Sequence, residues 1–368
     1  LLLKGSIGKP GAGTCPVRGH SNVQGDRTMG IWEKPSEQLC TSLEKHFNIP
    51  IPRAHGFDVV EAIEAMHAKS AKVFLAMGGN FLSATPDTEI TAQALKNCEL
   101  TVQISTKLNR SHIITGETAL ILPCLGRSEK DIQQGTEQFI TVEDSMGVVH
   151  KSSGNLKPIS THLKSEVDIV SQLAQYSLEA SPIPWADYPK NYDLIREEIQ
   201  ACIPGFDDYT KRVNRPGGFY LPNNARVANF DKLPNGKAQI TINKTSEIQL
   251  KESEFLMMTI RTHDQFNTTI YGLDDRYRGI LGERRVVLIN PEDIKNLGMK
   301  PGDLVDLSSH YDQIRRVDKF ILVAYDIPRS CIATYFPEAN PLVPLHLKAR
   351  KSNTPASKAV KVEIQSHD

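Results

Sequence analysis

Alternating helix and strand patterns between residues 58 and 122 constrain the fold of this chain more than any other feature. Residues 58–69 place apolar side chains at helical spacing, and residues 72–77 form a short, almost continuously apolar run. Such a run is typical of a strand that is buried on both faces of a sheet. A second helix is predicted over 87–97, and further strands over 100–104 and 119–122. This order predicts a parallel α/β sheet with right-handed crossovers, similar to a Rossmann domain.

The last part of the chain has a different pattern, in which short strands are separated by turns. Residues 290–297 carry a proline near the first turn, as short helices often do. Short strands joined by such turns predict a closed β-barrel. The predicted strands are 255–261, 285–289, 304–308, 319–325 and 359–364.

These patterns divide the chain into four predicted parts. Residues 1–30 are a glycine-rich loop, and residues 31–180 are an α/β region. Residues 181–250 are predicted to be a connector, because they are rich in Pro, Gly, Asn and Tyr and lack a long periodic stretch. Residues 251–368 are the β-barrel domain.

The glycine-rich loop places Arg18 and His20 among glycines, a proline and small polar residues. Glycines let a backbone approach a ligand closely, and such a loop presents polar groups instead of packing a core. From composition alone, the loop is equally consistent with a binding site and with a flexible surface loop.

Composition excludes several classes of partner. The chain has 43 basic and 43 acidic residues, so we expect neither nucleic acid nor an anionic membrane as a partner. No apolar run approaches the roughly 18 residues of a membrane span, and we expect no membrane segment. Six scattered cysteines form no Cys-x-x-Cys pair, which argues against a locally encoded zinc or iron–sulfur site. A reduced, cytoplasmic protein fits this usage best.

Two polar loops follow neighbouring strands of the predicted sheet. Gly78, Gly79 and Asn80 come directly after the first strand, and residues 105–111 come after the second. In open α/β sheets, ligands bind beyond the carboxyl ends of the strands. The two loops therefore predict a crevice for a nucleotide-sized ligand, and the alternative is a pair of tight turns without a ligand.

A third dense polar cluster, residues 261–269, follows the first predicted barrel strand. All but one of its side chains can form hydrogen bonds. The cluster is either a ligand-binding loop, which we favour, or a solvated strand end.

At these positions the chain resembles molybdopterin oxidoreductases related to formate dehydrogenase, in the branch of YdeP-type proteins. Residues 17–25 with Met29 and Gly30 resemble the Arg-Gly-x-x-Asn-x-Gln-Gly…Met-Gly signature of that family. Residues 259–272 and 290–303 resemble its C-terminal molybdopterin dinucleotide-binding domain, and residues 333–343 resemble a late pterin-contacting loop. The resemblance covers nearly the whole chain and implies a barrel of the double-psi type, preceded by half of a dinucleotide-binding α/β domain.

The resemblance also implies roles for individual residues. Arg18 would be catalytic beside the metal, where a planar, charged fork suits a small carboxylate. His20 would be the second catalytic residue, at a position where formate dehydrogenases usually carry glutamine. The cofactor-binding residues would be Asn22, Gln24, Gly78, Gly79, Asn80, Thr106, Asn109, Arg261, Thr262, His263, Gln265, Asn267, Asn340 and Lys358.

The implied cofactor is bis-molybdopterin guanine dinucleotide with molybdenum, which would carry the redox chemistry. The implied metal ligand, and the residues of a 4Fe–4S cluster if the protein has one, would lie upstream of residue 1. We expect a small-molecule substrate, formate or another small oxyanion, and an electron-transfer partner protein. We also expect the isolated 368 residues to be inactive.

Two other functions are consistent with the same loops. The chain could be a module that binds or carries the molybdopterin cofactor without turnover, in which case Arg18 would not be needed beside the metal. It could also be a nicotinamide-dependent Rossmann oxidoreductase, but the Gly-x-Gly-x-x-Gly fingerprint is missing.

Overall fold

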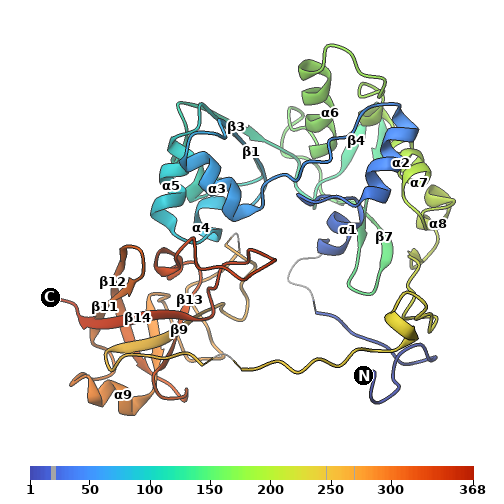
Figure 1. The fold of residues 1–368 in the computed structure, drawn as a ribbon. Helices are drawn as coiled ribbons and strands as arrows, with labels where there is room; N and C mark the ends of the chain where they lie inside the picture. The colour runs from blue at the N-terminus through green and yellow to red at the C-terminus, as the bar shows by residue number, and fades with distance from the viewer. Residues whose placement is uncertain (18–21, 246, 269) are drawn as a thin grey trace. The chain divides into compact units, whose positions relative to one another are not determined.

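The computed structural model describes residues 1–17, 22–245, 247–268 and 270–368 (Figure 1). The chain forms two compact units. Unit 1 contains Leu1–Gly56 and Cys124–Thr245, and unit 2 contains Phe57–Pro123 and Ser246–Asp368. Unit 2 groups the segment 57–123 with residues 246–368, so the predicted α/β region 31–180 is divided between the two units.

The α/β part of unit 2 is a three-stranded parallel sheet, as the sequence predicts. Its strands are β1 (Val73–Met77), β2 (Leu100–Ser105) and β3 (Thr118–Pro123), in the order β1-β2-β3. Val73 of β1 lies opposite Leu100, and Leu100 lies opposite Thr118. All three carboxyl ends therefore lie at one edge of the sheet.

The helices of this part are α3 (Val59–His67), α4 (Phe81–Ala84) and α5 (Thr88–Lys96), with a 3-10 turn η1 at Arg110–Ile113. Asp58 starts α3 with a capping box, since its carboxylate accepts the backbone N–H groups of Val60 and Glu61. The cores of α3 and α5 pack together beside β1 (Figure 1).

The prediction that 72–77 is buried on both faces is wrong for this strand. Phe74 packs on the core of α3 and α5, whereas Val73, Leu75 and Met77 point the other way and are exposed. Alternation along a strand sends these side chains to the opposite face, and a continuous apolar run carries no signal of which face the helices cover.

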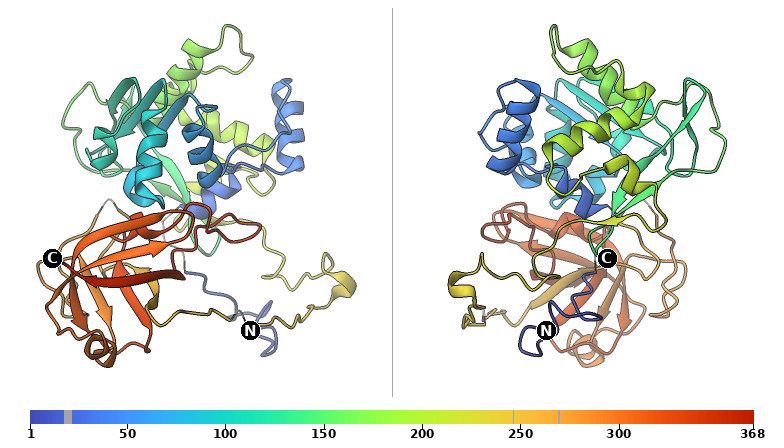
Figure 2. Two further views of the ribbon diagram at one scale, coloured as in Figure 1. Left: turned by 60° about the vertical axis from the view of Figure 1, so that its left-hand side comes forward. Right: turned by 90° about the vertical axis from the view of Figure 1, so that its right-hand side faces the viewer.

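The C-terminal part of unit 2 is a closed six-stranded barrel, drawn in orange and red in Figure 2. The strand order is β10-β12-β11-β14-β9-β13, and a short helix α9 (Pro291–Asn296) follows β10. The strands are β9 (Glu254–Ile260), β10 (Val286–Ile289), β11 (Leu304–His310), β12 (Ile314–Ala324), β13 (Cys331–Tyr335) and β14 (Val360–Ser366). The predicted barrel is thereby confirmed.

Strand β13 is the one barrel strand that the sequence patterns miss. The run from Ala333 was assigned to a loop, but Cys331–Tyr335 pairs in parallel with β9 and antiparallel with β10. Ile332 and Tyr335 are fully buried. The strand is short and follows a turn at Pro328, so its pattern is too brief to stand out.

Unit 1 combines short strands with helices around its own core. Its helices are α1 (Val23–Thr28), α2 (Glu37–Phe47), α6 (Glu166–Ser177), α7 (Tyr192–Cys202) and α8 (Tyr209–Val213), with 3-10 turns η2 (Tyr188–Lys190) and η3 (Pro234–Gly236). Its strands are β4 (Asp131–Gln133), β5 (Thr136–Gln138), β6 (Ile140–Glu143), β7 (Val148–Ser152) and β8 (Phe219–Tyr220). Within the described residues, no helix is both long and apolar enough to cross a lipid bilayer.

The first part of the predicted connector, 181–250, is a folded part of unit 1. Phe206, Tyr209 and Phe219 are buried and stack edge to face, with ring centroids 4.7 to 6.0 Å apart. This aromatic cluster has no helical or strand period, which explains why the sequence patterns miss it. Residues 237–245 have no regular structure and are exposed, as expected for a connector.

A buried ion pair joins the sheet to the barrel within unit 2. Arg315 of β12 donates to the Asp87 carboxylate at 2.6 Å, and both side chains are at most 6% exposed. The same carboxylate accepts the backbone N–H of Leu345 at 3.2 Å, and the Asp87 N–H donates to the carbonyl of Asn340 at 3.1 Å. Asp87 thus holds the start of α5 against three segments of the barrel domain.

We predict that Asp87→Ala lowers the free energy of unfolding of unit 2 by about 3–5 kcal/mol, because it leaves the Arg315 charge buried without its main partner. Asp312→Ala is the matched control: Asp312 also pairs with Arg315, at 2.8 Å, but is half exposed. The control should cost about 1 kcal/mol or less. If urea unfolding shows the same loss of unfolding free energy for the two variants, the proposed importance of the buried Asp87–Arg315 pair is contradicted.

Candidate functional site

A cavity of about 860 Å³ opens in unit 2 where loops after β1 and β2 meet loops of the barrel. Two residues predicted for cofactor binding, Asn80 and Asn109, line it. The sequence analysis placed both at strand ends, and the structure brings them to one cavity. Further lining residues are Arg110, Thr268, Tyr271, Arg284, Arg285 and Arg316.

The two glycines after β1 shape this edge. Gly78 and Gly79 have φ angles of +72° and +75°, in the left-handed region that favours glycine. A side chain added at either position would meet open space, so the backbone is approachable from outside. The Gly79 carbonyl accepts a hydrogen bond from the Asn109 amide at 2.7 Å, which links the loops after β1 and β2.

Asn80 is buried and forms hydrogen bonds both to the sheet side and to the barrel side of unit 2. Its amide N–H donates to the Thr268 carbonyl at 3.3 Å, and its oxygen accepts the Ser111 hydroxyl at 2.9 Å. Asn109 caps η1 and accepts the Ser111 N–H at 3.0 Å. Thr106, the other residue predicted in this loop, is exposed. The two asparagines therefore hold the loops in place as well as lining the cavity.

The barrel loop after β9 carries five further predicted residues. Thr262 and Gln265 are buried, and the Gln265 oxygen accepts the Thr262 N–H at 3.1 Å. His263 is exposed and stacks on the Tyr277 ring, with centroids 3.8 Å apart. The Arg261 guanidinium lies 5.2 Å from the centroid of the Phe336 ring, and Asn267 has a positive φ of 44°.

The last two predicted residues lie at the edges of this region. Asn340 is buried, and its amide donates to the Ser83 carbonyl, at the end of α4, at 2.7 Å. The Lys358 ammonium donates to the Thr259 carbonyl of β9. Burial of this ammonium, and the nearby charge of Arg261, lower the pKa of Lys358.

Thr268 is a lining residue that the sequence analysis did not select. Its side chain is 4% exposed, and its hydroxyl has no hydrogen-bond partner among the described residues. A buried hydroxyl without a partner is costly unless something else completes it. In the sequence, Thr268 is distinguished only by its place in the polar run 261–269, in which neighbouring residues are the predicted cofactor-binding residues.

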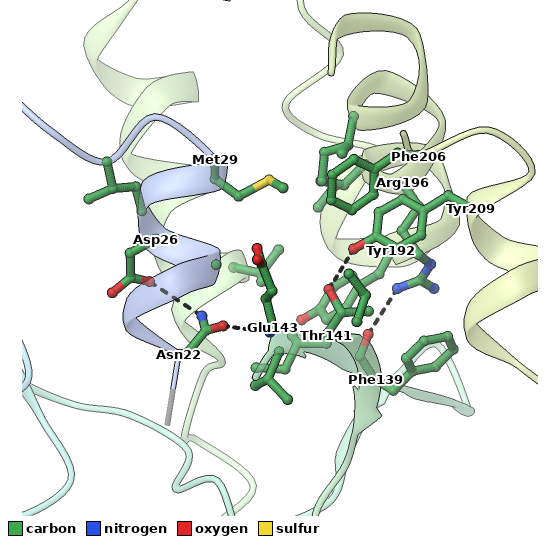
Figure 3. A pocket seen from close by; sticks show the side chains of 18 residues that line it. Asn22, Asp26, Met29, Phe139, Thr141, Glu143, Tyr192, Arg196, Phe206 and Tyr209 are labelled. Atoms are coloured by element: carbon green, nitrogen blue, oxygen red, sulfur yellow. Dashed lines mark hydrogen bonds between the residues drawn. The ribbon is translucent and has the colours of Figure 1, made fainter. Parts of the chain in front are cut away.

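The predicted residues near the chain start belong to unit 1. Arg18 and His20 lie outside the described residues, and their catalytic roles remain predictions. Asn22 immediately precedes α1, and its side-chain oxygen accepts the Glu143 N–H of β6 at 3.0 Å (Figure 3). Gln24 lies in α1 and lines a second cavity, of about 680 Å³, together with Thr28 and Glu143.

Glu143 holds both ends of α1. Its backbone N–H bonds to Asn22 at the start of the helix, and its carboxylate accepts the Thr28 hydroxyl at the end, at 2.5 Å. The side chain is 7% exposed, and burial raises the pKa of this carboxyl. Residues 23–28, predicted as part of the glycine-rich loop 1–30, thus form a helix that Glu143 fixes to β6.

Among the described residues, no group of three or more His, Cys, Asp or Glu side chains is arranged to hold a metal ion.

Comparison with known families matches residues 255–361 to the Molydopterin dinucleotide binding domain. This range runs from β9 into β14. The barrel matches the molybdopterin dinucleotide-binding domain over this range. Thr262, Gln265, Thr268 and Arg284 lie inside the matched range. Of these four, Thr268 and Arg284 line the cavity, which Asn80 and Asn109 line from the loops after the sheet strands.

Longer relatives match the whole chain. An uncharacterized oxidoreductase of Mycobacterium tuberculosis is 53% identical over 99% of this chain and 48% of its own length. Protein YdeP of Escherichia coli is 42% identical over 99% of this chain and 49% of its own length. A formate dehydrogenase alpha subunit of Methanocaldococcus jannaschii is 25% identical over 93% of this chain and 51% of its own length. The chain is thus homologous to oxidoreductases and spans about half of their length.

We predict that Glu143→Gln raises the thermal stability of unit 1 more at pH 7 than at pH 4.5. The folded-state pKa of Glu143 lies above its usual 4.5, so its stabilising contribution is complete below pH 4.5 and is lost as the pH rises through the folded pKa. Glutamine keeps the acceptor for Thr28 and carries no charge.

The difference in melting temperature between variant and wild type, measured by circular dichroism across this pH range, checks the prediction. Glu179→Gln, at an exposed position of the same unit, is the control and should show no such trend. A difference for Glu143→Gln that is independent of pH would contradict the assigned cause.

Proposed function

We propose that this chain is the cofactor-binding part of a molybdenum-dependent oxidoreductase that transfers two electrons to or from a small substrate. The cofactor is bis-molybdopterin guanine dinucleotide, and the substrate is formate or another small oxyanion. The matched molybdopterin dinucleotide-binding domain and the homologous oxidoreductases support this proposal.

One observation carries the proposal: a polar cavity reaches the matched domain, and one of its lining residues, Thr268, has a buried hydroxyl without a hydrogen-bond partner among the described residues. Its volume of about 860 Å³ falls within the range of small-molecule and cofactor sites. Asn80 and Asn109 line the cavity with amide groups. Gly78 and Gly79 directly precede Asn80 and are not lining residues, but their open backbone suits a phosphate or a sugar beside the cavity. The residues present therefore fit the dinucleotide end of the cofactor.

Charge around the cavity fits the same ligand. Arg110, Arg285 and Arg316 line it and are exposed, so their guanidinium groups can reach phosphate oxygens. Three acidic residues also line the cavity: Asp318 is exposed, whereas the carboxylates of Glu283 and Glu338 are engaged within the protein. Glu338 pairs with Arg284 at 2.7 Å, and Glu283 accepts the backbone N–H groups of Arg284 and Arg285.

When bound, the molybdenum centre supplies the two-electron chemistry, and this chain supplies binding and orientation. In our proposal Arg18 binds a substrate carboxylate or oxyanion through its planar fork. His20, at a position usually occupied by glutamine in formate dehydrogenases, is a point at which substrate preference departs from theirs. Asn22 and Glu143 hold α1, which begins at Val23, after His20 in the sequence.

The proposal extends to the whole protein. We place it in the cytoplasm, with an electron-transfer partner protein and, where the longer relatives provide the ligands, a 4Fe–4S cluster. Turnover then requires the half of the relatives that this chain does not span, and the isolated chain binds cofactor without catalysing.

The binding part of the proposal is tested by Thr268→Val with guanosine diphosphate as the probe for the dinucleotide end. Valine has nearly the same shape but no hydroxyl. We expect titration calorimetry on the full chain to show binding to wild type and roughly 3- to 10-fold weaker binding to the variant, because a hydrogen bond is lost. The variant should be more stable by about 1 kcal/mol without ligand, because an unpaired buried hydroxyl is removed.

Thr334→Val is the matched control, since Thr334 in β13 also has a buried hydroxyl without a partner among the described residues. It does not line the cavity. The control should gain similar stability and bind the probe as wild type does. Failure of wild type to bind, or equal weakening in both variants, would contradict the proposed site.

A further inference from the structure

Arg284 occupies an unusual position for a charged residue, two residues before the start of β10 at Val286 and only 2% exposed. Its guanidinium donates to both Glu338 oxygens, at 2.7 and 3.1 Å. Its other acceptors are the Thr262 hydroxyl at 3.4 Å, the Gln265 side-chain oxygen at 3.0 Å and the Phe336 carbonyl at 2.7 Å. A buried arginine with this many partners is fixed in one geometry.

These acceptors belong to two separate loops. Thr262 and Gln265 follow β9, whereas Phe336 and Glu338 follow β13. Because β9 and β13 run in parallel, both loops leave the barrel at the same edge. The guanidinium lies 4.4 Å from the centroid of the Tyr271 ring and 5.0 Å from that of Tyr335. Arg284 therefore ties together the two loops that bound the cavity on the barrel side.

Gln265 completes this connection. Its amide N–H groups donate to the carbonyls of Asn267 and Phe336, each at 2.6 Å. Its oxygen accepts the Thr262 N–H and the Arg284 guanidinium. Two donated and two accepted bonds fill the capacity of a glutamine amide. The hydrogen bonds of the Gln265 side chain therefore stabilise the loop after β9, and Thr268 of this loop lines the cavity.

We propose that Arg284 is a positioning residue for the dinucleotide site: its planar fork fixes the loop 261–268 relative to 336–338, and so sets where the Thr268 hydroxyl meets the ligand. The inference rests on the proposed function, because it concerns the same cavity. In this proposal Arg284 affects ligand binding by holding the loop that carries Thr268. Gln265 holds the same loop.

The fork geometry makes the inference testable. Arg284→Ala removes the fork, and Arg284→Lys keeps the charge opposite Glu338 but has a single ammonium in place of a planar group. We expect guanosine diphosphate to bind at least roughly 10-fold more weakly to both variants than to wild type. Millimolar guanidinium ion should restore binding to Arg284→Ala, and the same concentration of methylammonium should not.

Arg329→Ala is the control, since Arg329 lies in the same barrel domain, pairs with Asp293 at 2.9 Å and is more than half exposed. It should bind the probe as wild type does. Native affinity in Arg284→Lys, or lost binding in Arg284→Ala that guanidinium does not restore, would overturn the positioning role. Absence of binding in wild type would instead contradict the proposed function.

Discussion

The Asp87–Arg315 ion pair is the interaction on which the candidate site depends most. The cavity exists because the carboxyl edge of a parallel sheet faces the barrel within one compact unit. Asp87 joins the start of α5 to β12 and to the backbone of residues 340 and 345. Asn80 and Asn340 add bonds in the same region. A buried ion pair is favourable only when both partners are held in place. The contacts of Asp87 therefore also fix the position of α5 relative to the barrel.

Local sequence features predicted the elements that obey local rules. The helical spacing over 58–69 corresponds to α3, and the apolar runs at 72–77 and 100–104 form parallel strands. The glycines after β1 have the left-handed backbone that their sequence position suggests. Asn80 and Asn109 line one cavity because parallel strands end at the same edge, a rule that needs no coordinates.

Features that depend on tertiary contacts could not be predicted in this way. Strand β13 is only five residues long and follows a turn, which leaves too little pattern to predict it. The burial of β1 was not predictable because a continuous apolar run does not show which face the helices cover. Arg284 reads as one of two consecutive arginines, and only the fold shows that it is buried whereas Arg285 is exposed. Thr268 looks like any loop threonine until its hydroxyl is found buried without a partner.

The central claim is that the cavity between the sheet edge and the barrel binds the dinucleotide end of the cofactor. A crystal structure of the full chain with guanosine diphosphate tests it most directly. We predict that the nucleotide lies in this cavity, within hydrogen-bond distance of the Thr268 hydroxyl, with its phosphates near the Gly78–Gly79 backbone or the lining arginines. A nucleotide bound elsewhere, with the Thr268 hydroxyl still unpaired, would contradict the account.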